Sequence, residues 1–353
     1  MYLLVILISL ALEKFLPALS RLRSLSWVTH YQQWIHARLA NHPKWQGVPS
    51  LLIIILLPVI GTAVVQYYLN DLLALFSFVF SIIVLTYCLG PEDEHRRVND
   101  YLDAVEDENR SDKDNIQTDL AEILQAGGVA SGTTTIDEER RISRLIESVL
   151  IITHDRMLAI LFWFVVLGPM GAVLYRLTLA LSQNKEKDQH NPQAITDDAE
   201  NPTENSAENS AENSLEINDG NDFNADFNTE FNDAVKRLHF LLGWIPSHLT
   251  ALSYAVMGSF VHALNVWKDR RKEGSATGPD KDQQERRNTV ESTIDGTTAN
   301  RDLLLRVGLA SLQFNTNPPQ DNNAVRETLG LCGRSLVAWI TILAIMTLAG
   351  WAS

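Results

Sequence analysis

Two long apolar stretches dominate the first third of the chain, and only Asn70 and Asp71 separate them. Residues 51–69 and 72–89 contain no Asp, Glu, Lys or Arg. A helix needs about 20 predominantly apolar residues to cross the hydrocarbon core of a bilayer. The pattern therefore predicts a transmembrane helical hairpin over 51–89 with a two-residue polar tip.

Four further apolar stretches predict additional membrane segments. Met1–Leu12 lacks the basic start and small-residue cleavage site of a removable signal peptide, so it predicts a retained membrane helix. This stretch is shorter than a usual span, and a re-entrant or interfacial segment is the alternative. Residues 158–181 predict one transmembrane helix, and residues 335–353 predict a C-terminal one. Residues 234–267 predict a weaker span, kinked or partly re-entrant at Pro246.

The rest of the N-terminal unit, residues 1–50, is basic and predicts an amphipathic interfacial helix after the first apolar one. Aromatic and apolar residues recur there at helical spacing: Trp27, Tyr31, Trp34 and Ile35. A basic helix with one aromatic face lies well among anionic lipid headgroups. The alternative is a helix that packs on other parts of the protein.

Three polar segments separate the remaining apolar stretches. Residues 90–157 predict a cytoplasmic helical segment, and residues 268–334 predict a polar cytoplasmic loop with a short helix over 303–312. Residues 182–233 are rich in Asn and acids, with ENSAENSAENS and FNADFNTEFND as low-complexity runs. Such a composition cannot bury enough apolar area to offset its ordering entropy, so it predicts a disordered insertion. The insertion is either a tolerated loop extension or a regulatory tether.

Together these segments predict an all-α fold: a polytopic helical membrane protein with cytoplasmic helical segments and a disordered Asn/acid-rich loop. Lys and Arg number 5 in residues 14–50, 8 in 90–157 and 11 in 265–334, against none in 70–71 and 4 in 182–237. Excess Lys and Arg mark the cytoplasmic side of a membrane protein. The counts predict that the first three segments face the cytoplasm, and that both termini and the Asn-rich loop face outside.

Charge and cysteine content narrow the classes of partner. The net charge is −14, from 29 basic and 43 acidic residues, and this argues against a nucleic-acid partner. The lipid bilayer is the expected partner, and the cytoplasmic helical segments are the expected surface for a protein partner. Cys88 and Cys332 are the only cysteines, and they predict free buried thiols rather than a disulfide or zinc framework.

Candidate site residues gather around the predicted span over 158–181. No phosphate-loop, nucleophile-elbow or zinc motif occurs, so we expect no catalytic residue, metal or cofactor. Gly127 and Gly128 form only a fragment of a phosphate loop. Ionisable residues within a membrane segment are functional candidates, although many only anchor a helix at the interface. The ligand-binding candidates are Glu147, His154, Asp155, Arg156, Trp163, Tyr175 and Arg176; for Arg176 we expect its side chain to reach the outer headgroups rather than bind a ligand.

Two stretches of sequence resemble a known family. ESVL at 147–150 with LFWFVVLGPMGAVLYR at 161–176, and FLLGWIPSHLTAL at 240–252, are similar to the signature regions of AmpE. AmpE is a bacterial inner-membrane protein linked to β-lactamase induction. The resemblance implies a multi-pass protein of the bacterial inner (cytoplasmic) membrane and a signalling role in the response to antibiotic.

The same stretches resemble, more distantly, the CobD/CbiB adenosylcobinamide-phosphate synthases. Those enzymes follow the Tyr-Arg pair with a polar run, whereas Tyr175 and Arg176 are followed here by the apolar sequence LTLAL. An ATP-driven amide ligase needs charge to hold Mg²⁺ and phosphates. The comparison implies that the scaffold is kept and the chemistry lost.

Three functional hypotheses follow from the sequence. The first is a non-catalytic, AmpE-like regulator of β-lactamase induction that responds to cell-wall status. The second is a CobD/CbiB-like amide ligase of cobamide biosynthesis. The third is a transporter or binding protein for a small cell-wall fragment, with its site near Trp163 and Arg176.

Overall fold

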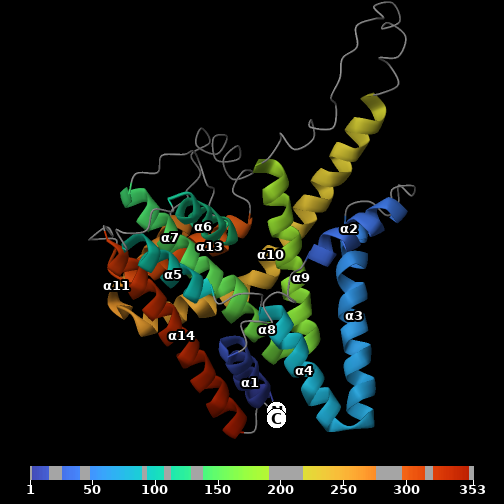
Figure 1. Cartoon of the computed structure of the whole chain (residues 1–353), viewed down its shortest axis with the longest axis horizontal. Helices are drawn as coiled ribbons and strands as arrows, with labels where there is room; N and C mark the ends of the chain where they lie inside the picture. Colours follow the sequence, from blue (N-terminus) through green and yellow to red (C-terminus); the bar gives the residue numbers. More distant parts are fainter. Residues whose placement is uncertain are drawn as a thin grey trace, which may run out of the picture.

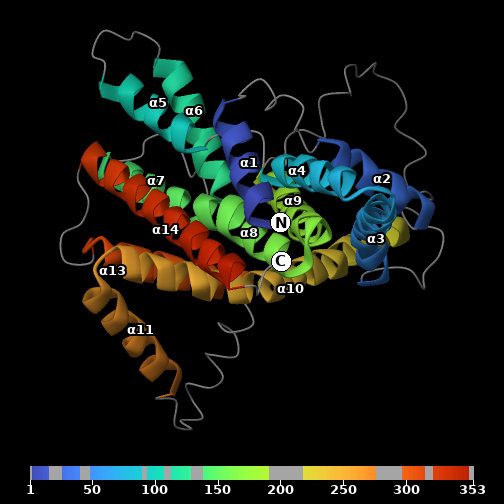
Figure 2. The ribbon, with the colours of Figure 1, turned by 90° about the horizontal axis from the view of Figure 1, so that it is seen from below.

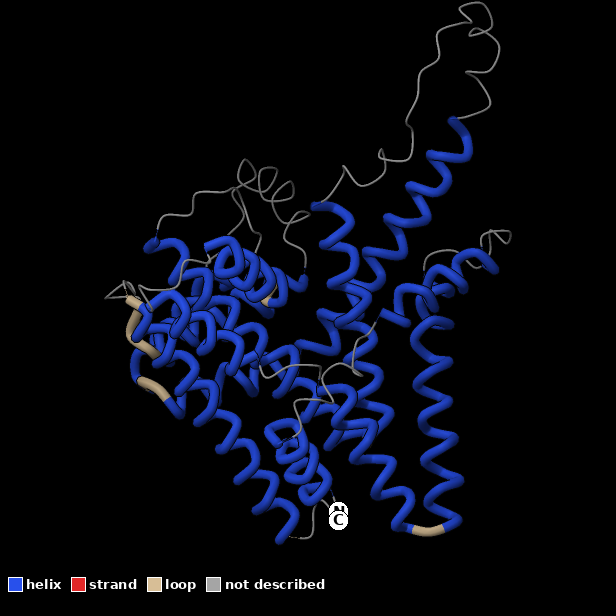
Figure 3. The backbone as a smooth tube through the Cα atoms, viewed as in Figure 1, coloured by secondary structure: helices blue, strands red, loops and turns tan. Residues whose placement is uncertain are grey.

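The computed structural model describes residues 2–15, 26–39, 48–89, 94–106, 113–128, 138–190, 218–275, 296–314 and 321–349. Every regular element within these ranges is a helix, and none of the described residues forms a strand (Figure 3). The helices long and apolar enough to cross a membrane are Val48–Leu72, Arg141–Leu167, Glu230–Met257 and Asn322–Leu348. These features confirm the predicted class, an all-α polytopic membrane protein.

The predicted hairpin is formed by α3 (Val48–Leu72) and α4 (Ala74–Leu89), which turn at Leu73. Within it, Gln66 Nε2 donates a hydrogen bond to Ser77 Oγ over 2.6 Å, so the polar side chain finds its partner on the neighbouring helix. Large apolar side chains are exposed along both helices, as a lipid environment favours: Leu52, Leu57, Ile60, Val64, Tyr68, Leu75, Phe76 and Ile83.

Two N-terminal helices pack beside this hairpin. α1 (Tyr2–Phe15) contacts α4, and α2 (Ser26–Leu39) contacts α3. α2 packs on other parts of the protein, which is one of the two alternatives that the sequence left open for it. Val28 and Ile35 are buried against α3, whereas the Trp34 ring is exposed and lies under the Arg38 guanidinium.

Five other helices form a second layer, here called the α5–α7 layer after its first three members. It contains α5 (Glu94–Glu106), α6 (Lys113–Ala126), α7 (Glu138–Thr153), α11 (Phe260–Ser275) and α13 (Gly296–Ser311). Helical spacing on α7 places one apolar face in the common core, with Ile142, Leu145, Ile146 and Val149 all buried. Figure 1 shows α5, α6, α7 and α13 at the upper left, away from the turn between α3 and α4 at the lower edge, and Figure 2 shows α11 projecting from the body.

The long helix α14 (Asn322–Leu348) begins well before residue 335, where the sequence predicted its start. Asp321 caps it, accepting a hydrogen bond from the backbone N–H of Ala324. Its first turns pack on α5, where the Arg326 guanidinium pairs with Asp103 and Glu106. Hydrogen bonding from Arg326 lowers the pKa of Glu106 below its usual range. Residues 268–334 are therefore more helical than the predicted polar loop, with α11 ending at Ser275 and α13 covering Gly296–Ser311.

The single helix predicted over 158–181 is instead two helices that fold back on each other. α8 (Ala159–Leu167) ends at Gly168, and α9 (Pro169–His190) starts at the next residue. Gly168 has φ 72° and ψ −156°, a conformation essentially restricted to glycine, and proline is well suited to the first position of a helix. Gly171 allows the close return, because a Cβ there would overlap the carbonyl of Trp163.

This reversal changes the predicted position of the Asn-rich loop. The start of α3, with Leu51 and Ile54, packs against Leu177 and Leu181 in the middle of α9. The chain therefore leaves α9 at the end of the helical array opposite the α3–α4 turn, not at the same end. The predicted disorder over 182–233 also differs from the structure, in which α9 continues to His190 and α10 begins at Asn218; residues 191–217 lie outside the described residues.

Replacing Gly171 should destabilise the α8–α9 return. We expect Gly171→Ala to reduce the free energy of unfolding by about 1–3 kcal/mol, because an added methyl group overpacks the contact with Trp163. Thermal unfolding in detergent micelles measures the effect. Gly61→Ala is the matched control, since a Cβ at that helical glycine meets nothing within 4 Å. Equal melting temperatures for the two variants would contradict the prediction.

Candidate functional site

The continuous helix formed by α7 and α8 contains a π-helical segment, η3 (His154–Leu158). Single π-helical turns are rare and occur frequently at functional sites. The residue before the segment, Thr153, donates its hydroxyl to the Val149 carbonyl over 2.8 Å. The wider turn places two neighbouring ionisable residues, His154 and Asp155, among the surrounding helices rather than on a solvent face.

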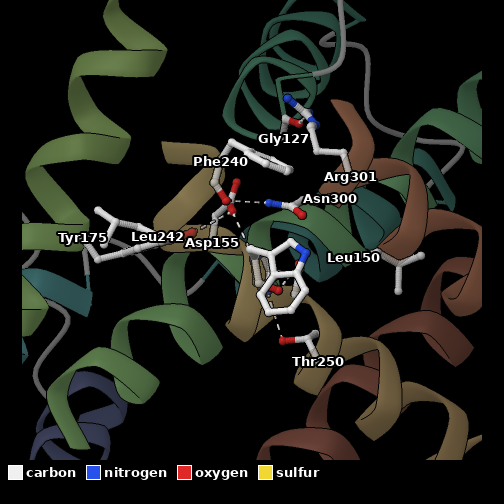
Figure 4. A network of polar contacts seen from close by, with 12 residues as sticks. Gly127, Leu150, Asp155, Tyr175, Phe240, Leu242, Thr250, Asn300 and Arg301 are labelled. Carbon is white, nitrogen blue, oxygen red and sulfur yellow. Dashed lines mark hydrogen bonds and ion pairs between the residues drawn. The ribbon is translucent and has the colours of Figure 1, made fainter. Parts of the chain in front are cut away.

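These two residues connect η3 to α9 and α10 (Asn218–Met257). His154 has 3% of its side chain exposed, and its Nδ1 lies 3.0 Å from Thr250 Oγ1. Asp155 has 14% exposed, and its Oδ1 lies 3.7 Å from His154 Nε2. The Tyr175 hydroxyl donates to the same Oδ1 over 3.2 Å (Figure 4). The Tyr175 ring also lies 5.9 Å, centroid to centroid, from the ring of His239. We call His154, Asp155, Tyr175, His239 and Thr250 the η3 cluster.

Beside the η3 cluster, the backbone of α10 accepts hydrogen bonds from two other helices. Pro246 has no N–H, so the carbonyl of Leu242 loses its usual partner within the helix. Trp163 Nε1 on α8 donates to that carbonyl over 3.0 Å. Asn300 Nδ2 on α13 donates to the nearby carbonyl of Phe240, also over 3.0 Å (Figure 4). The Trp163 side chain thus replaces the hydrogen bond that Pro246 removes from the Leu242 carbonyl.

The glycine pair at the end of α6 has a packing role in the structure. Arg301 on α13 donates a hydrogen bond to the Gly127 carbonyl. Gly128 has φ +61°, and a Cβ there would overlap the Arg301 guanidinium. A Cβ on Gly127 would lie 2.7 Å from the Cα of Ser148 on α7. The pair therefore allows close contact of α6 with α7 and α13.

The structure brings together some of the predicted site residues and separates others. His154, Asp155 and Tyr175 form one hydrogen-bonded set, and Trp163 supports it through α10. Glu147 lies on α7 with Arg144 and Arg301 as its interacting cations, so it belongs to the contact between α7 and α13. Arg156, also on η3, is half-buried.

Arg176 differs from the sequence-based expectation. We expected its guanidinium to reach the outer headgroups, but the residue is only 6% exposed. Cys88 on α4 and Tyr175 are its electrostatic neighbours. The reversal at Gly168 is the reason, because α9 runs between α3, α4 and α10 instead of continuing out of the array.

Sequence reasoning missed three polar members of the arrangement, which are Thr250, His239 and Asn300. Thr250 lies within the SHLTAL sequence that was already noted, and its distance from the other candidates along the chain hid its role. Asn300 begins the buried face of α13, directly before Arg301. No local motif marks Thr250 or Asn300, because only the crossing of α10 with η3 and α13 brings these two residues to the site.

The segment after Tyr175 and Arg176 is packed inside the protein. Residues 177–181 are all buried, and the apolar members belong to the two cores around α3 and α4. Phosphate groups and Mg²⁺ require charged or polar ligands. The residues at these positions do not fit such a group.

Comparison with known proteins gives one result. The CobD/Cbib protein family model matches residues 6–181, just under half of the chain. The matched segment contains all seven candidates from the sequence and ends at the last residue of the buried LTLAL stretch. No curated protein and no solved structure matches the chain.

Removing the indole N–H of Trp163 should destabilise the site. We expect Trp163→Phe to reduce the free energy of unfolding by about 1–3 kcal/mol, because the half-buried Leu242 carbonyl is left without a donor. Trp244→Phe is the control, because that side chain is 51% exposed. Hydrogen exchange of α10 in detergent micelles reports the change locally. Equal protection around Pro246 in both variants would show that the bond contributes nothing.

Proposed function

We propose that this protein is a CobD/CbiB-like membrane protein that binds a small polar ligand at the η3 cluster. The observation that carries the proposal is the coincidence of the family match with the cluster. The match over residues 6–181 includes η3, α8 and most of α9, which supply His154, Asp155 and Tyr175. His154, Asp155, His239 and Thr250 of the cluster also lie within helices apolar enough to cross a membrane, where ionisable groups are functional candidates.

The chemistry of the cluster favours a ligand with a hydrogen-bond donor. Asp155 keeps 14% of its side chain exposed while its Oδ1 accepts from Tyr175. A carboxylate can accept at both oxygens, and hydrogen bonds to a charged acceptor are stronger than neutral ones. An amine or hydroxyl group of a ligand fits this position. Tyr175 and His154 then orient the carboxylate rather than react with the ligand.

The first candidate activity is the one associated with the CobD/CbiB family, amide formation in cobamide biosynthesis. The family match supports this candidate. The second candidate is an AmpE-like regulator, in which the same site senses a ligand without catalysis. The buried, apolar character of residues 177–181 favours the second candidate, because an ATP-driven ligase needs charge near its phosphates.

Two strains test the proposal and separate the candidates. We expect the chain, expressed in a bacterium that lacks its own CobD/CbiB protein, to restore cobamide synthesis if it is a ligase. We expect its deletion from the source bacterium to change β-lactamase induction if it is a regulator. Asp155→Asn should reduce whichever activity is found by roughly tenfold to a hundredfold, the effect of losing a charge-assisted hydrogen bond.

Matched variants control for loss of protein. Asp71→Asn and Tyr67→Phe make the same chemical changes as Asp155→Asn and Tyr175→Phe, but at exposed positions on α3. Protein levels in the membrane fraction are measured for all four. Full activity of both η3-cluster variants, in the assay that responds to the wild-type chain, would refute the proposed site. A chain that affects neither assay would refute both activities.

We also propose that the protein lies in a bacterial cytoplasmic membrane with the α5–α7 layer on the cytoplasmic side. The Lys and Arg excess in residues 90–157 and 265–334 supports this orientation. The reversal at Gly168 then adds residues 191–217 to the cytoplasmic side, while the α3–α4 turn and both termini face outside.

Reporter fusions test the orientation. A reporter that is active only in the cytoplasm should be active when inserted at Ser206 and inactive when fused after Ser353. A periplasmic reporter should give the opposite pattern at the same two positions. Activity of the cytoplasmic reporter at Ser353, or of the periplasmic reporter at Ser206, would contradict the proposed orientation.

A further inference from the structure

Three helical paths pass from the α5–α7 layer into the layer around the hairpin, here called the hairpin layer. They are the continuous helix of α7 and α8, the long helix α10, and α14 (Figure 1). Each path contributes buried side chains to the core of the α5–α7 layer on one side and to the cores around α3 and α4 on the other. Each path is also irregular, or weakened, between those two sets of side chains or directly beside that passage.

On the first path, the irregular segment is η3. Leu150 belongs to the core of the α5–α7 layer, and Ala159 belongs to the core of the hairpin layer. The π-helical residues His154–Leu158 lie between them. A π-bulge interrupts the regular hydrogen-bond ladder and is a recognised cause of helix bending.

On the second path, the irregular residue is a proline. Leu242 packs against the hairpin-layer core, and Ala251 belongs to the α5–α7 core. Pro246 lies between them and removes one backbone hydrogen bond from α10. The helix changes direction along its length in Figure 1.

On the third path, two glycines weaken the helix. Cys332 belongs to the α5–α7 core, and Leu336 packs against the hairpin-layer core. Gly333 lies between these two residues and Gly330 lies one turn earlier, and a Cβ on either glycine would meet nothing within 4 Å. Close packing within the chain therefore does not require glycine there, although glycine in a helix interior is less favourable than alanine by about 1 kcal/mol.

We propose that η3, Pro246 and the Gly330–Gly333 segment form one hinge, about which the α5–α7 layer moves relative to the hairpin layer. Three weakened helices at the same passage allow a concerted bend that any single regular helix would resist. The hinge passes through the η3 cluster, where Thr250 on α10 meets His154 on η3. Its motion therefore changes the position of α10 relative to the Asp155 carboxylate. The inference does not depend on which activity the protein has.

Two hydrogen bonds cross the hinge in the structure. Asn300 on α13 donates to the Phe240 carbonyl, on the hairpin-layer side of Pro246, over 3.0 Å. Trp339 lies on α14 beyond the glycines, and its Nε1 donates to Ser253 Oγ over 2.8 Å. Ser253 lies on α10 beyond Pro246, so the bond joins the hairpin-layer part of α14 to the α5–α7 part of α10. The Trp339 ring also lies 6.4 Å from that of Phe162 on α8. Movement about the hinge must break or lengthen this contact.

Spin labels on the two layers test the hinge. Asp100→Cys on α5 and Leu75→Cys on α4 are both at exposed positions, while the native Cys88 and Cys332 are buried. Pulsed dipolar spectroscopy of the labelled, full-length protein in lipid vesicles should show two distance populations. A label pair within the hairpin layer, Tyr68→Cys with Ile83→Cys, should show one.

Variants of the hinge should shift these populations in opposite directions. We expect Gly330→Ala with Gly333→Ala to reduce the minor population at least about fivefold, because alanine resists helix bending. We expect Ser253→Ala to increase it, because the bond to Trp339 is lost. Gly61→Ala, on α3 and outside the passage, should change neither population.

Two outcomes would overturn the hinge. One is a single narrow distance population between the layers that none of the variants changes. The other is a change in oligomeric mass for the Gly330→Ala, Gly333→Ala protein, measured by light scattering in detergent, with no change in the interlayer distances. That result would show that the glycines serve contact between chains instead of bending.

Discussion

Backbone polar groups inside an apolar helical array need partners, and this constraint shapes the centre of the protein. A regular helix satisfies its own backbone, whereas a proline or a π-helical turn releases groups that must bond elsewhere. Here the carbonyl released by Pro246 accepts from Trp163, and the neighbouring Phe240 carbonyl accepts from Asn300. The irregular segments are therefore held by specific side chains from other helices. Polar side chains are therefore concentrated around Pro246 and η3, where they supply these hydrogen bonds.

The reversal at Gly168 has a comparable influence on the architecture. It converts one apparent span into a pair of helices and returns the chain to the end at which α3 begins. Arg176 is buried as a consequence, and Tyr175 is brought to Asp155. Without the reversal, the same residues on a straight helix would lie on a lipid-facing or outward path. The cluster thus depends on a glycine that contributes no side chain to it.

The sequence predicted the parts of the fold that depend on local composition. The hairpin over 51–89 follows from its hydrophobicity and its two-residue polar tip alone. The reversal at Gly168 was missed, because a continuous apolar run outweighed the Gly-Pro pair that often ends a helix. Residues 218–233 form part of α10 although their composition resembles disorder; phenylalanines recur there every four residues, and Phe231 is buried. The four-residue spacing of these phenylalanines was the helical signal that the sequence prediction overlooked.

The candidate site was only half predictable, and the reason is physical. His154, Asp155 and Tyr175 lie within one contiguous region where charge interrupts an apolar pattern, so each is visible in the sequence. Thr250 and Asn300 are ordinary helix residues whose importance comes from the crossing of distant helices. The π-helical turn is likewise set by tertiary contacts and has no sequence motif. A site at the crossing of irregular helices therefore combines ionisable residues that the sequence shows with hydrogen-bond partners that only the packing reveals. The same crossing makes the site sensitive to movement between the two layers.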